Sequence, residues 1–437
     1  MTRPRGSVAA GSPPLDGARR SEILHIASDL FAASGYTRTS LKDVADACGI
    51  LPGSLYHHFD SKQAIATELL ERYYAELDEI GGRWVDDPPL GPAARTADRI
   101  TALGIAIAEC AVRHGAALHL AAYEPHAGAS PDLVGLARRK PEAVTAAMQR
   151  ILDDAATRGD LVERVDPTLL THQLVETMLH VGLGRLHKDG SPARTATLLC
   201  AMVLRGLANQ PPADRALNRS AAMGAASATI AQWSAAADDD VDERRAALRA
   251  VARVEFARRG YEATTIRDIA SAAGMGTGTV YRLVDGKEAL LASIMNTFYT
   301  RLSAGYEAVA GAPATAIERL DALTWLNINA RERFSQEFEI QQAWFRSYPP
   351  ETSTLSDSLR ERTRIVRAIV GIGLDREEIR TDQIAGHVTS LDELTPCVRD
   401  LIWVPPSVVG RTTTRGVLAH ARATVLRGAL APAARSA

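Results

Sequence analysis

The sequence predicts an all-α protein made of two tandem copies of one unit. Only 5% of the 437 residues are aromatic, and the alternating Val- and Ile-rich runs typical of strands are missing. A shift of 225 residues places residues 19–70 on residues 244–295 without a gap, and 17 of these 52 positions are identical. We therefore expect a duplicated domain rather than two unrelated ones.

The first copy carries the periodicity of short amphipathic helices. Apolar residues of segment 23–31 recur at i, i+3, i+4, i+7 and i+8, and Gly35 is expected to end this helix. Ser40 and Asp43 have the spacing of an N-cap and its acidic partner, which predicts a second helix of barely two turns. A third short helix should follow Gly49, and Asp60 is expected to cap a fourth.

The second copy repeats this scheme. Thr265 and Asp268 form the equivalent cap, Gly274 the turn, and Asp285 is the expected cap of the last helix. Segment 208–240, with Pro211-Pro212 at one end and three aspartates at the other, is expected to be a linker containing one Ala-rich helix. The predicted division is a flexible arm over 1–17, headpieces over 18–72 and 242–297, regulatory bundles over 73–210 and 298–432, and a linker over 211–241.

Two short helices joined by a glycine turn, after a longer supporting helix, are typical of the helix-turn-helix. A recognition helix must expose small or polar side chains at its N-terminal end to enter the major groove. That end reads Leu51-Pro52-Gly53-Ser54 in the first copy and Gly276-Thr277-Gly278-Thr279 in the second. The tyrosines Tyr56 and Tyr281, and the lysines Lys62 and Lys287 at the next helix start, are expected to reach phosphates.

Residues 39–64 (TSLKDVADACGILPGSLYHHFDSKQA) and 264–289 (TTIRDIASAAGMGTGTVYRLVDGKEA) closely resemble the TetR/AcrR family of transcriptional regulators. The first copy keeps the family's L-Y-H-H-F signature, whereas the second has Leu283 and Val284 in place of its last two residues. The resemblance covers about 105 residues strongly. It implies a helical ligand-binding and dimerising half after each headpiece.

The resemblance also implies roles for single residues. Base-edge contacts are expected from residues 51–54 and 276–279. For Tyr56 and Tyr281 the alternative to a phosphate contact is a half-buried cap on the helical core. Phosphate contacts are expected from Ser40, Tyr56, His57 and Lys62, and in the second copy from Thr265, Tyr281, Arg282 and Lys287. Arg3 and Arg5 form either a minor-groove arm or a solvated tail.

The distribution of charge distinguishes the two copies. The whole chain has a formal net charge of −2, which by itself argues weakly against a polyanionic partner. Residues 244–295 hold nine Arg and Lys against five Asp and Glu (9 − 5 = +4), whereas residues 19–70 hold five against six (5 − 6 = −1). Because phosphate neutralisation supplies much of the affinity for DNA, the excess favours a DNA-binding second headpiece.

Other classes of protein receive little support. No apolar run approaches the roughly 20 residues needed to span a bilayer, and the N-terminus lacks the apolar stretch of a secretory signal, so we expect a cytoplasmic protein with no membrane partner. The four cysteines are at least sixty positions apart and are expected to be reduced thiols. The glycine run 274–278 follows a helix rather than a strand, so it is no dinucleotide loop. We expect no enzyme, cofactor or metal.

The regulatory halves are less informative. Six of the eleven histidines lie within 73–207, at spacings that match no short metal motif, and they favour an effector-pocket lining or a plain surface. The aromatic residues of 325–348 form either an apolar ligand cavity or ordinary core; they are Trp325, Phe334, Phe338, Trp344, Phe345 and Tyr348.

Together these features predict a sequence-specific DNA-binding regulator, a repressor released by a small apolar or amphipathic effector. Its DNA partner would be a double-stranded operator. One chain already carries two headpieces, so it is expected to act either as an intrachain pseudo-dimer or as a homodimer with four headpieces. The alternative function leaves DNA binding to the first headpiece and makes the second repeat a dimerisation or partner-binding module.

Overall fold

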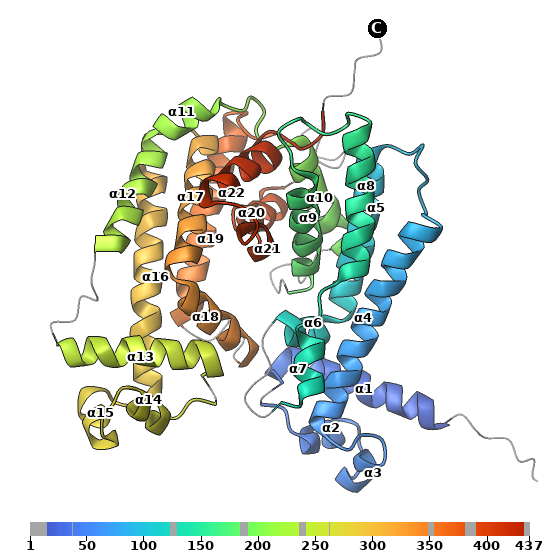
Figure 1. Cartoon of the computed structure of the whole chain (residues 1–437), viewed down its shortest axis with the longest axis vertical. Helices are drawn as coiled ribbons and strands as arrows, with labels where there is room; N and C mark the ends of the chain where they lie inside the picture. Colours follow the sequence, from blue (N-terminus) through green and yellow to red (C-terminus); the bar gives the residue numbers. More distant parts are fainter. Residues whose placement is uncertain are drawn as a thin grey trace, which may run out of the picture.

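The structure, a computed structural model, describes residues 15–36, 38–122, 129–183, 191–235, 242–261, 263–347, 354–380 and 390–431. All named elements of these residues are helices, and the extended segments meet only in the isolated bridges Leu161–Leu430 and Ala208–Ile379. The all-α prediction is confirmed. Figure 1 shows two helical bundles side by side, with both headpieces at the same end of the molecule.

The first unit begins with a three-helix headpiece and continues into seven bundle helices. The headpiece consists of α1 (Leu15–Ser34), α2 (Leu41–Ala47) and α3 (Pro52–Tyr56). The bundle consists of α4 (Lys62–Asp86), α5 (Thr96–Arg113), α6 (Gly115–Ala122), α7 (Pro131–Ala137), α8 (Glu142–Thr157), α9 (Pro167–Val181) and α10 (Pro192–Arg205).

The second unit repeats this order after two additional helices, α11 (Asp214–Arg219) and α12 (Ala221–Ala235). Its headpiece consists of α13 (Glu243–Arg259), α14 (Ile266–Ala272) and α15 (Thr277–Leu283). Its bundle consists of α16 (Lys287–Gly311), α17 (Ala316–Arg333), α18 (Ser335–Ser347), α19 (Thr354–Asp375), α20 (Leu391–Leu401), α21 (Pro406–Val409), α22 (Thr414–Ala421) and the π-helix η3 (Arg422–Leu426).

Several boundaries differ from those expected. Residues 1–14 of the expected arm lie outside the described residues, and α1 begins at Leu15 within it. The limits expected at residues 72 and 297 fall inside α4 and α16, because each helix runs unbroken from its headpiece into its bundle. In the expected linker, α12 packs along α16 and α17, so it adds a helix to the second bundle.

Two expected helix caps were one residue off. The cap of α4 is Ser61, whose hydroxyl accepts a hydrogen bond from the backbone N–H of Ala64, rather than Asp60. The residue before α16 is Gly286 at φ 119°, rather than Asp285. By contrast, the two predicted N-caps at Ser40 and Thr265 each form a complete capping box with the acidic residue three positions later.

The two units meet where the ends of α10 and η3 cross. Leu207 N–H donates to Val425 O at 2.8 Å, and Ala429 N–H donates to Val203 O at 3.0 Å. Adding 222 to 203 and 207 gives 425 and 429, so each bond is the counterpart of the other. The bonds from Ala208 to Leu426 (3.1 Å) and from Leu430 to Leu204 (2.9 Å) obey the same rule (204 + 222 = 426; 208 + 222 = 430). The contact is therefore reciprocal, as at a two-fold axis.

Glycines allow the two backbones to approach this closely. Gly206 has φ 82°, and a Cβ on it would lie 2.4 Å from the carbonyl carbon of Arg427. Gly428 has φ 95°, and its Cβ would lie 2.4 Å from the carbonyl carbon of Arg205. Any side chain at either position would therefore separate the crossing segments.

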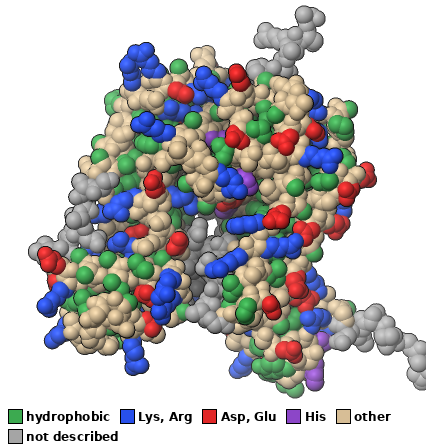
Figure 2. All heavy atoms as spheres, viewed as in Figure 1, with side chains coloured by type: hydrophobic (Ala, Val, Ile, Leu, Met, Phe, Trp, Pro, Cys, Tyr) green, Lys and Arg blue, Asp and Glu red, His purple; other side chains and the backbone are tan. Residues whose placement is uncertain are grey.

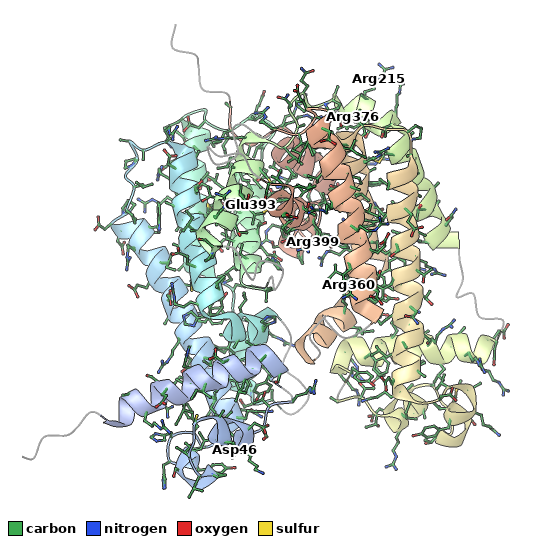
Figure 3. All side chains as sticks on the ribbon, turned by 180° about the vertical axis from the view of Figure 1, so that it is seen from behind. Asp46, Arg215, Arg360, Arg376, Glu393 and Arg399 are labelled. Carbon is green, nitrogen blue, oxygen red and sulfur yellow. The ribbon has the colours of Figure 1, made fainter. Side chains whose placement is uncertain are left out.

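Side chains extend the contact between the units. His420 on α22 and Gln173 on α9 are hydrogen-bonded at 2.9 Å, and both are buried. Arg194 at the start of α10 pairs with Glu393 on α20, which lies at the junction of the bundles in Figure 3. The Ser407 hydroxyl donates to the carboxylate of Glu176.

Candidate nucleic-acid interface

The first headpiece presents the N-terminal end of α3 to solvent. Leu55 is fully buried and Phe59 nearly so, and together they anchor this short helix to the core. Leu51, the N-cap residue, is 76% exposed, an unusual value for a leucine. Pro52, Gly53 and Ser54 are exposed beside it. The predicted base-reading segment is therefore accessible along its whole length.

The second headpiece presents α15 in the same way. Val280 is fully buried and takes the place of Leu55. Gly276, Thr277 and Gly278 are exposed and Thr279 is partly buried. The altered signature of this copy has therefore kept the exposed helix end.

The predicted phosphate-binding tyrosines are also accessible. Tyr56 is 53% exposed and Tyr281 is 59% exposed, which favours the DNA-facing interpretation over that of a buried cap. His57, the C-cap residue of α3, and Arg282 on α15 follow these tyrosines and are exposed. The Arg282 guanidinium donates to the Thr279 hydroxyl at 3.2 Å.

Ser40 and Thr265 are exposed at the start of the second helix of each headpiece. The backbone N–H and the hydroxyl of Ser40 donate to the Asp43 carboxylate, both at 2.7 Å. These hydrogen bonds lower the pKa of Asp43, and those from Thr265 lower the pKa of Asp268. The caps fix the turn that precedes the helix pair, so a phosphate approaching either hydroxyl would meet an ionised carboxylate.

Both lysines that are expected to reach phosphates also bond to the protein itself. The Lys62 ammonium donates to the carbonyls of Tyr36 and Thr39, each at 2.9 Å, and lies 4.4 Å from the centre of the Tyr36 ring. Burial lowers its pKa. The Lys287 ammonium donates to the Tyr261 carbonyl at 2.9 Å and lies 4.2 Å from that ring. Each lysine thus connects the loop after the first helix of its headpiece to the helix that the lysine itself begins, α4 or α16.

Sequence reasoning missed the tyrosines that support these lysines. Tyr36 packs edge-on against Phe31 with ring centroids 5.2 Å apart, and Tyr261 packs against Phe256 at 5.5 Å. Both tyrosines are identical between the copies, as are both lysines. That shared identity was the available signal, but only the fold brings residues 26 positions apart together.

The positive excess of the second headpiece is partly neutralised within the protein. Arg253 pairs at 3.1 Å with Glu337 of α18, which lies outside residues 244–295, whereas Arg258 and Arg259 pair with Glu255, which the net charge of +4 already includes. Figure 2 shows Lys and Arg side chains projecting around this headpiece. The net charge of +4 therefore overstates the charge offered to DNA, although its sign agrees with a polyanionic partner.

The aromatic residues of the second regulatory half were expected to form either a ligand cavity or ordinary core. Phe334 is buried in contact with Phe298 and Trp233, and Phe338 packs on Trp403. Together with the partly buried Trp325, these residues belong to the core rather than to the wall of an open cavity. The side chains of Trp344 and Phe345, together with Tyr348, lie outside the description.

All four cysteines lie in the described part of the chain. All four cysteines are buried and free. His126 and His187 lie outside the described residues, whereas His114 lies beside Glu76 and Cys110. No single described helix is long and apolar enough to cross a membrane; α5 and α6 reach that limit only as a pair bent by 92°.

Two exposed recognition helices, each carried on a three-helix headpiece, define a protein of the helix-turn-helix class. The sequence profile of the bacterial regulatory proteins of the tetR family matches residues 23–69 and again residues 248–294. These two segments therefore match the N-terminal domain of that family, which occurs twice in this chain.

Individual relatives match shorter stretches. The HTH-type transcriptional repressor KstR2 of Rhodococcus jostii (strain RHA1) is 47% identical over 77 residues, which are 16% of this chain and 36% of that protein. KstR2 of Mycolicibacterium smegmatis is 37% identical over 107 residues, or 24% and 49% of the two chains. The chain thus spans less than half the length of these relatives.

Among solved structures, the ketosteroid transcriptional regulator KstR2 of Mycobacterium tuberculosis matches 42% of this chain and 95% of its own. It is 26% identical, with a TM-score of 0.36.

Proposed function

We propose that this chain is a sequence-specific DNA-binding transcriptional regulator of the cytoplasm, a repressor that a small-molecule effector releases from its operator and that catalyses no reaction. The observation that carries the proposal is the pair of headpieces at one end of the molecule, each exposing the start of its third helix. The similarity to the KstR2 repressors supports the same function.

We further propose that one chain acts as an intrachain pseudo-dimer. The two recognition helices would enter successive major grooves on one face of DNA, about 34 Å apart. The reciprocal bonds around Gly206 and Gly428 support this proposal because they join two similar units as a two-fold interface joins two subunits. An effector would act by favouring a spacing of the headpieces that no longer fits these grooves.

The operator of such a protein would have two unlike halves. The first recognition helix opens with the apolar pair Leu51 and Pro52, whereas the second opens with Gly276 and Thr277. An exposed leucine side chain suits the methyl group of thymine, while a threonine hydroxyl can hydrogen-bond to any base edge. We therefore infer an asymmetric operator.

The proposed effector is a small amphipathic molecule. A groove of about 700 Å³ between α4 and α7 is lined by both charged and apolar groups, among them Glu71, Leu136, Arg138 and Lys140. Such a lining suits a molecule with an apolar body and a charged head group. The matches to KstR2 span at most 49% of those proteins, so no effector is transferred from them.

Footprinting on the DNA flanking its own gene tests DNA binding, because regulators of this type commonly control their own expression. The expected result is a protected site of two unlike halves. Light scattering of the purified protein tests the pseudo-dimer. The expected mass is 46.8 kDa, whereas a mass of about 94 kDa (2 × 46.8) would favour the homodimer with four headpieces.

The alternative, in which only the first headpiece reads DNA, predicts a different footprint. Its protected site would contain one half alone, and Tyr281→Ala would leave the operator affinity unchanged. The exposure of Tyr281 at 59%, like that of Tyr56, favours two reading headpieces.

A further inference from the structure

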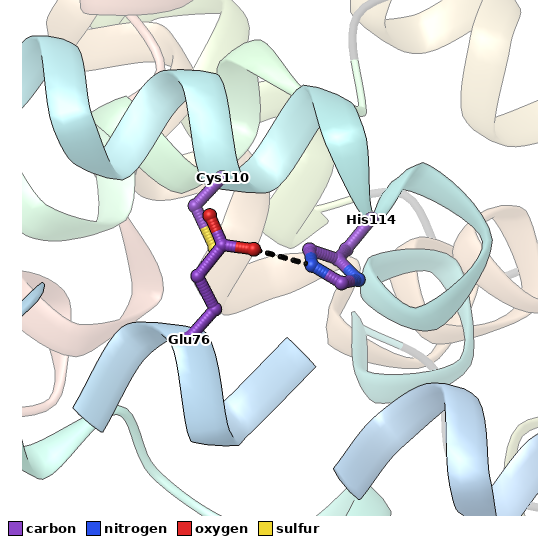
Figure 4. Close-up of side chains that lie close together, drawn as sticks. All are labelled: Glu76, Cys110 and His114. Carbon is purple, nitrogen blue, oxygen red and sulfur yellow. Dashed lines mark hydrogen bonds and ion pairs between the residues drawn. The ribbon is translucent and has the colours of Figure 1, made fainter. Parts of the chain in front are cut away.

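Three potential metal ligands meet where α4 passes the corner between α5 and α6. Glu76 comes from α4, and Cys110 and His114 lie one turn apart at the end of α5. A carboxylate oxygen, the thiol sulfur and a ring nitrogen all lie within 4.8 Å of one another. Figure 4 shows the three side chains converging, with His114 Nε2 at 2.8 Å from Glu76 Oε2. Thiolate, imidazole and carboxylate are the donors that Zn²⁺ takes in proteins.

The second unit shows that the fold itself requires neither the thiol nor the imidazole. Lys62 and Lys287 begin α4 and α16, so Glu76 corresponds to Arg301 (76 + 225). Thr96 and Ala316 begin α5 and α17, so Cys110 corresponds to Ala330 and His114 to Phe334 (110 + 220; 114 + 220).

The match at the end of these helices is close. His114 and Phe334 are both C-cap residues, with φ −105° and −117°. His114 contacts Tyr73 with ring centroids 5.9 Å apart, and Phe334 contacts Phe298 at 5.3 Å. The second unit places a phenyl ring, 3% exposed, where the first has an imidazole. Burying an imidazole costs free energy that burying a phenyl ring does not. Packing alone would therefore favour an apolar residue at position 114.

The surroundings of the cluster suit a cation. The Arg113 guanidinium holds Glu76 Oε1 at 2.6 Å, which leaves Oε2 facing the histidine. A ligating carboxylate oriented by an outer partner is typical of metal sites. Burial, followed by the charge of Glu76, raises the pKa of the Cys110 thiol to about 12. This shift works against the cation, which must displace the thiol proton in order to bind.

We propose that Glu76, Cys110 and His114 bind a divalent cation of the Zn²⁺ class, with water as the fourth ligand. Sγ of Cys110, a ring nitrogen of His114 and Oε2 of Glu76 supply the protein ligands. The thiol proton leaves to solvent when the metal–sulfur bond forms. The oxidation states of the sulfur and of the metal stay unchanged.

A cation here would act on one headpiece only. α4 begins within the first headpiece, where Lys62 fastens it to the loop after α1. α6 begins directly after His114, at a bend of 92° from α5, and packs against α1. The cation would thus fix α4 against the α5–α6 corner and set the position of the first headpiece. This step rests on the proposed function, whereas the binding site does not.

Metal titration of the full chain tests the site. The protein is reduced, treated with a chelator, and titrated with Co²⁺, whose thiolate complex absorbs by charge transfer; Zn²⁺ then displaces the cobalt. One equivalent with this absorption is expected. Glu76→Gln, Cys110→Ser and His114→Phe should each weaken binding at least tenfold, roughly the scale that loss of even an outer-shell partner has at other metal sites.

The control variant is Cys200→Ala, which removes another buried thiol and should bind the metal like the wild type. Circular dichroism verifies the fold of every variant, and His114→Phe copies a residue that the second unit already accommodates. No thiolate absorption in the wild type, or unchanged affinity in folded Cys110→Ser and Glu76→Gln, would overturn the site.

Operator binding measured with and without one equivalent of Zn²⁺ then tests the coupling. A change of affinity in the wild type that is lost in Cys110→Ser is expected. Cobalt binding without any change of operator affinity would overturn the coupling and support the site. If neither the chelated nor the zinc-loaded protein binds the operator, the proposed function fails instead.

Discussion

The crossing of the two units at Gly206 makes a quantitative prediction for Gly206→Ala. The backbone there, at φ 82° and ψ 149°, lies in a region that costs other residues about 1–3 kcal/mol. The new Cβ would also lie 2.4 Å from the Arg427 carbonyl carbon, which forces the two segments apart. Loss of the adjacent pair of reciprocal hydrogen bonds adds about 1 kcal/mol each. The free energy of unfolding should therefore fall by about 3–5 kcal/mol, the sum of these contributions.

Gly159→Ala is the matched control. Gly159 also has a positive φ, 75°, but a Cβ on it would meet nothing within 4 Å, so its substitution should cost only the backbone contribution of about 1 kcal/mol. Urea unfolding followed by circular dichroism measures both variants, and hydrogen exchange of the Leu207 and Ala429 amides reports on the crossing itself. If Gly206→Ala and Gly159→Ala unfold within 1 kcal/mol of each other, the close approach described here is wrong.

Four further outcomes are expected. Burial lowers the pKa of His420 to about 4. The stability that depends on the neutral ring is therefore complete above pH 6.5 and is lost as the pH falls towards 4. His420→Gln should flatten this step when unfolding is measured as a function of pH. Asp321→Asn breaks the buried pair with Arg422 and should lower the free energy of unfolding by about 3–5 kcal/mol in a urea titration, and no loss would contradict the pairing. Arg282→Ala should reduce the slope of log affinity against log salt by about 1 in operator titrations. Lys62→Met should lower the melting temperature and leave that slope unchanged, whereas a reduced slope would restore the phosphate contact first expected of this lysine.

Features that depend on local sequence were predictable. The capping boxes at Ser40 and Thr265 and the turn glycines Gly49 and Gly274 follow from spacings of a few residues. A cap or a stripe is specified by neighbours along the chain, so it can be recognised before the fold is known. The duplicated headpiece follows from the same signals appearing twice.

Features that depend on distant residues were not. Lys62 was expected to reach a phosphate. Its contact with Tyr36 could not be predicted, because that contact is set by the packing of α1 against α4. Glu76 and His114 are 38 positions apart on two different helices, and no short sequence motif predicts their contact. In the same way, α12 looked like part of a linker because its partners α16 and α17 lie far along the chain.

If the chain acts as the proposed pseudo-dimer, the crossing at Gly206 and Gly428 would also govern how DNA occupancy depends on the amount of protein. Separate subunits must meet before they can read a two-part site, so occupancy at low abundance rises with the square of their concentration. Here each half meets its partner at an effective concentration set by the connecting chain, in the millimolar range for short linkers. Occupancy then rises in proportion to the number of chains, and a cell holding a few copies has every one of them assembled. In such a pseudo-dimer the two halves would also stay matched, because both belong to one chain.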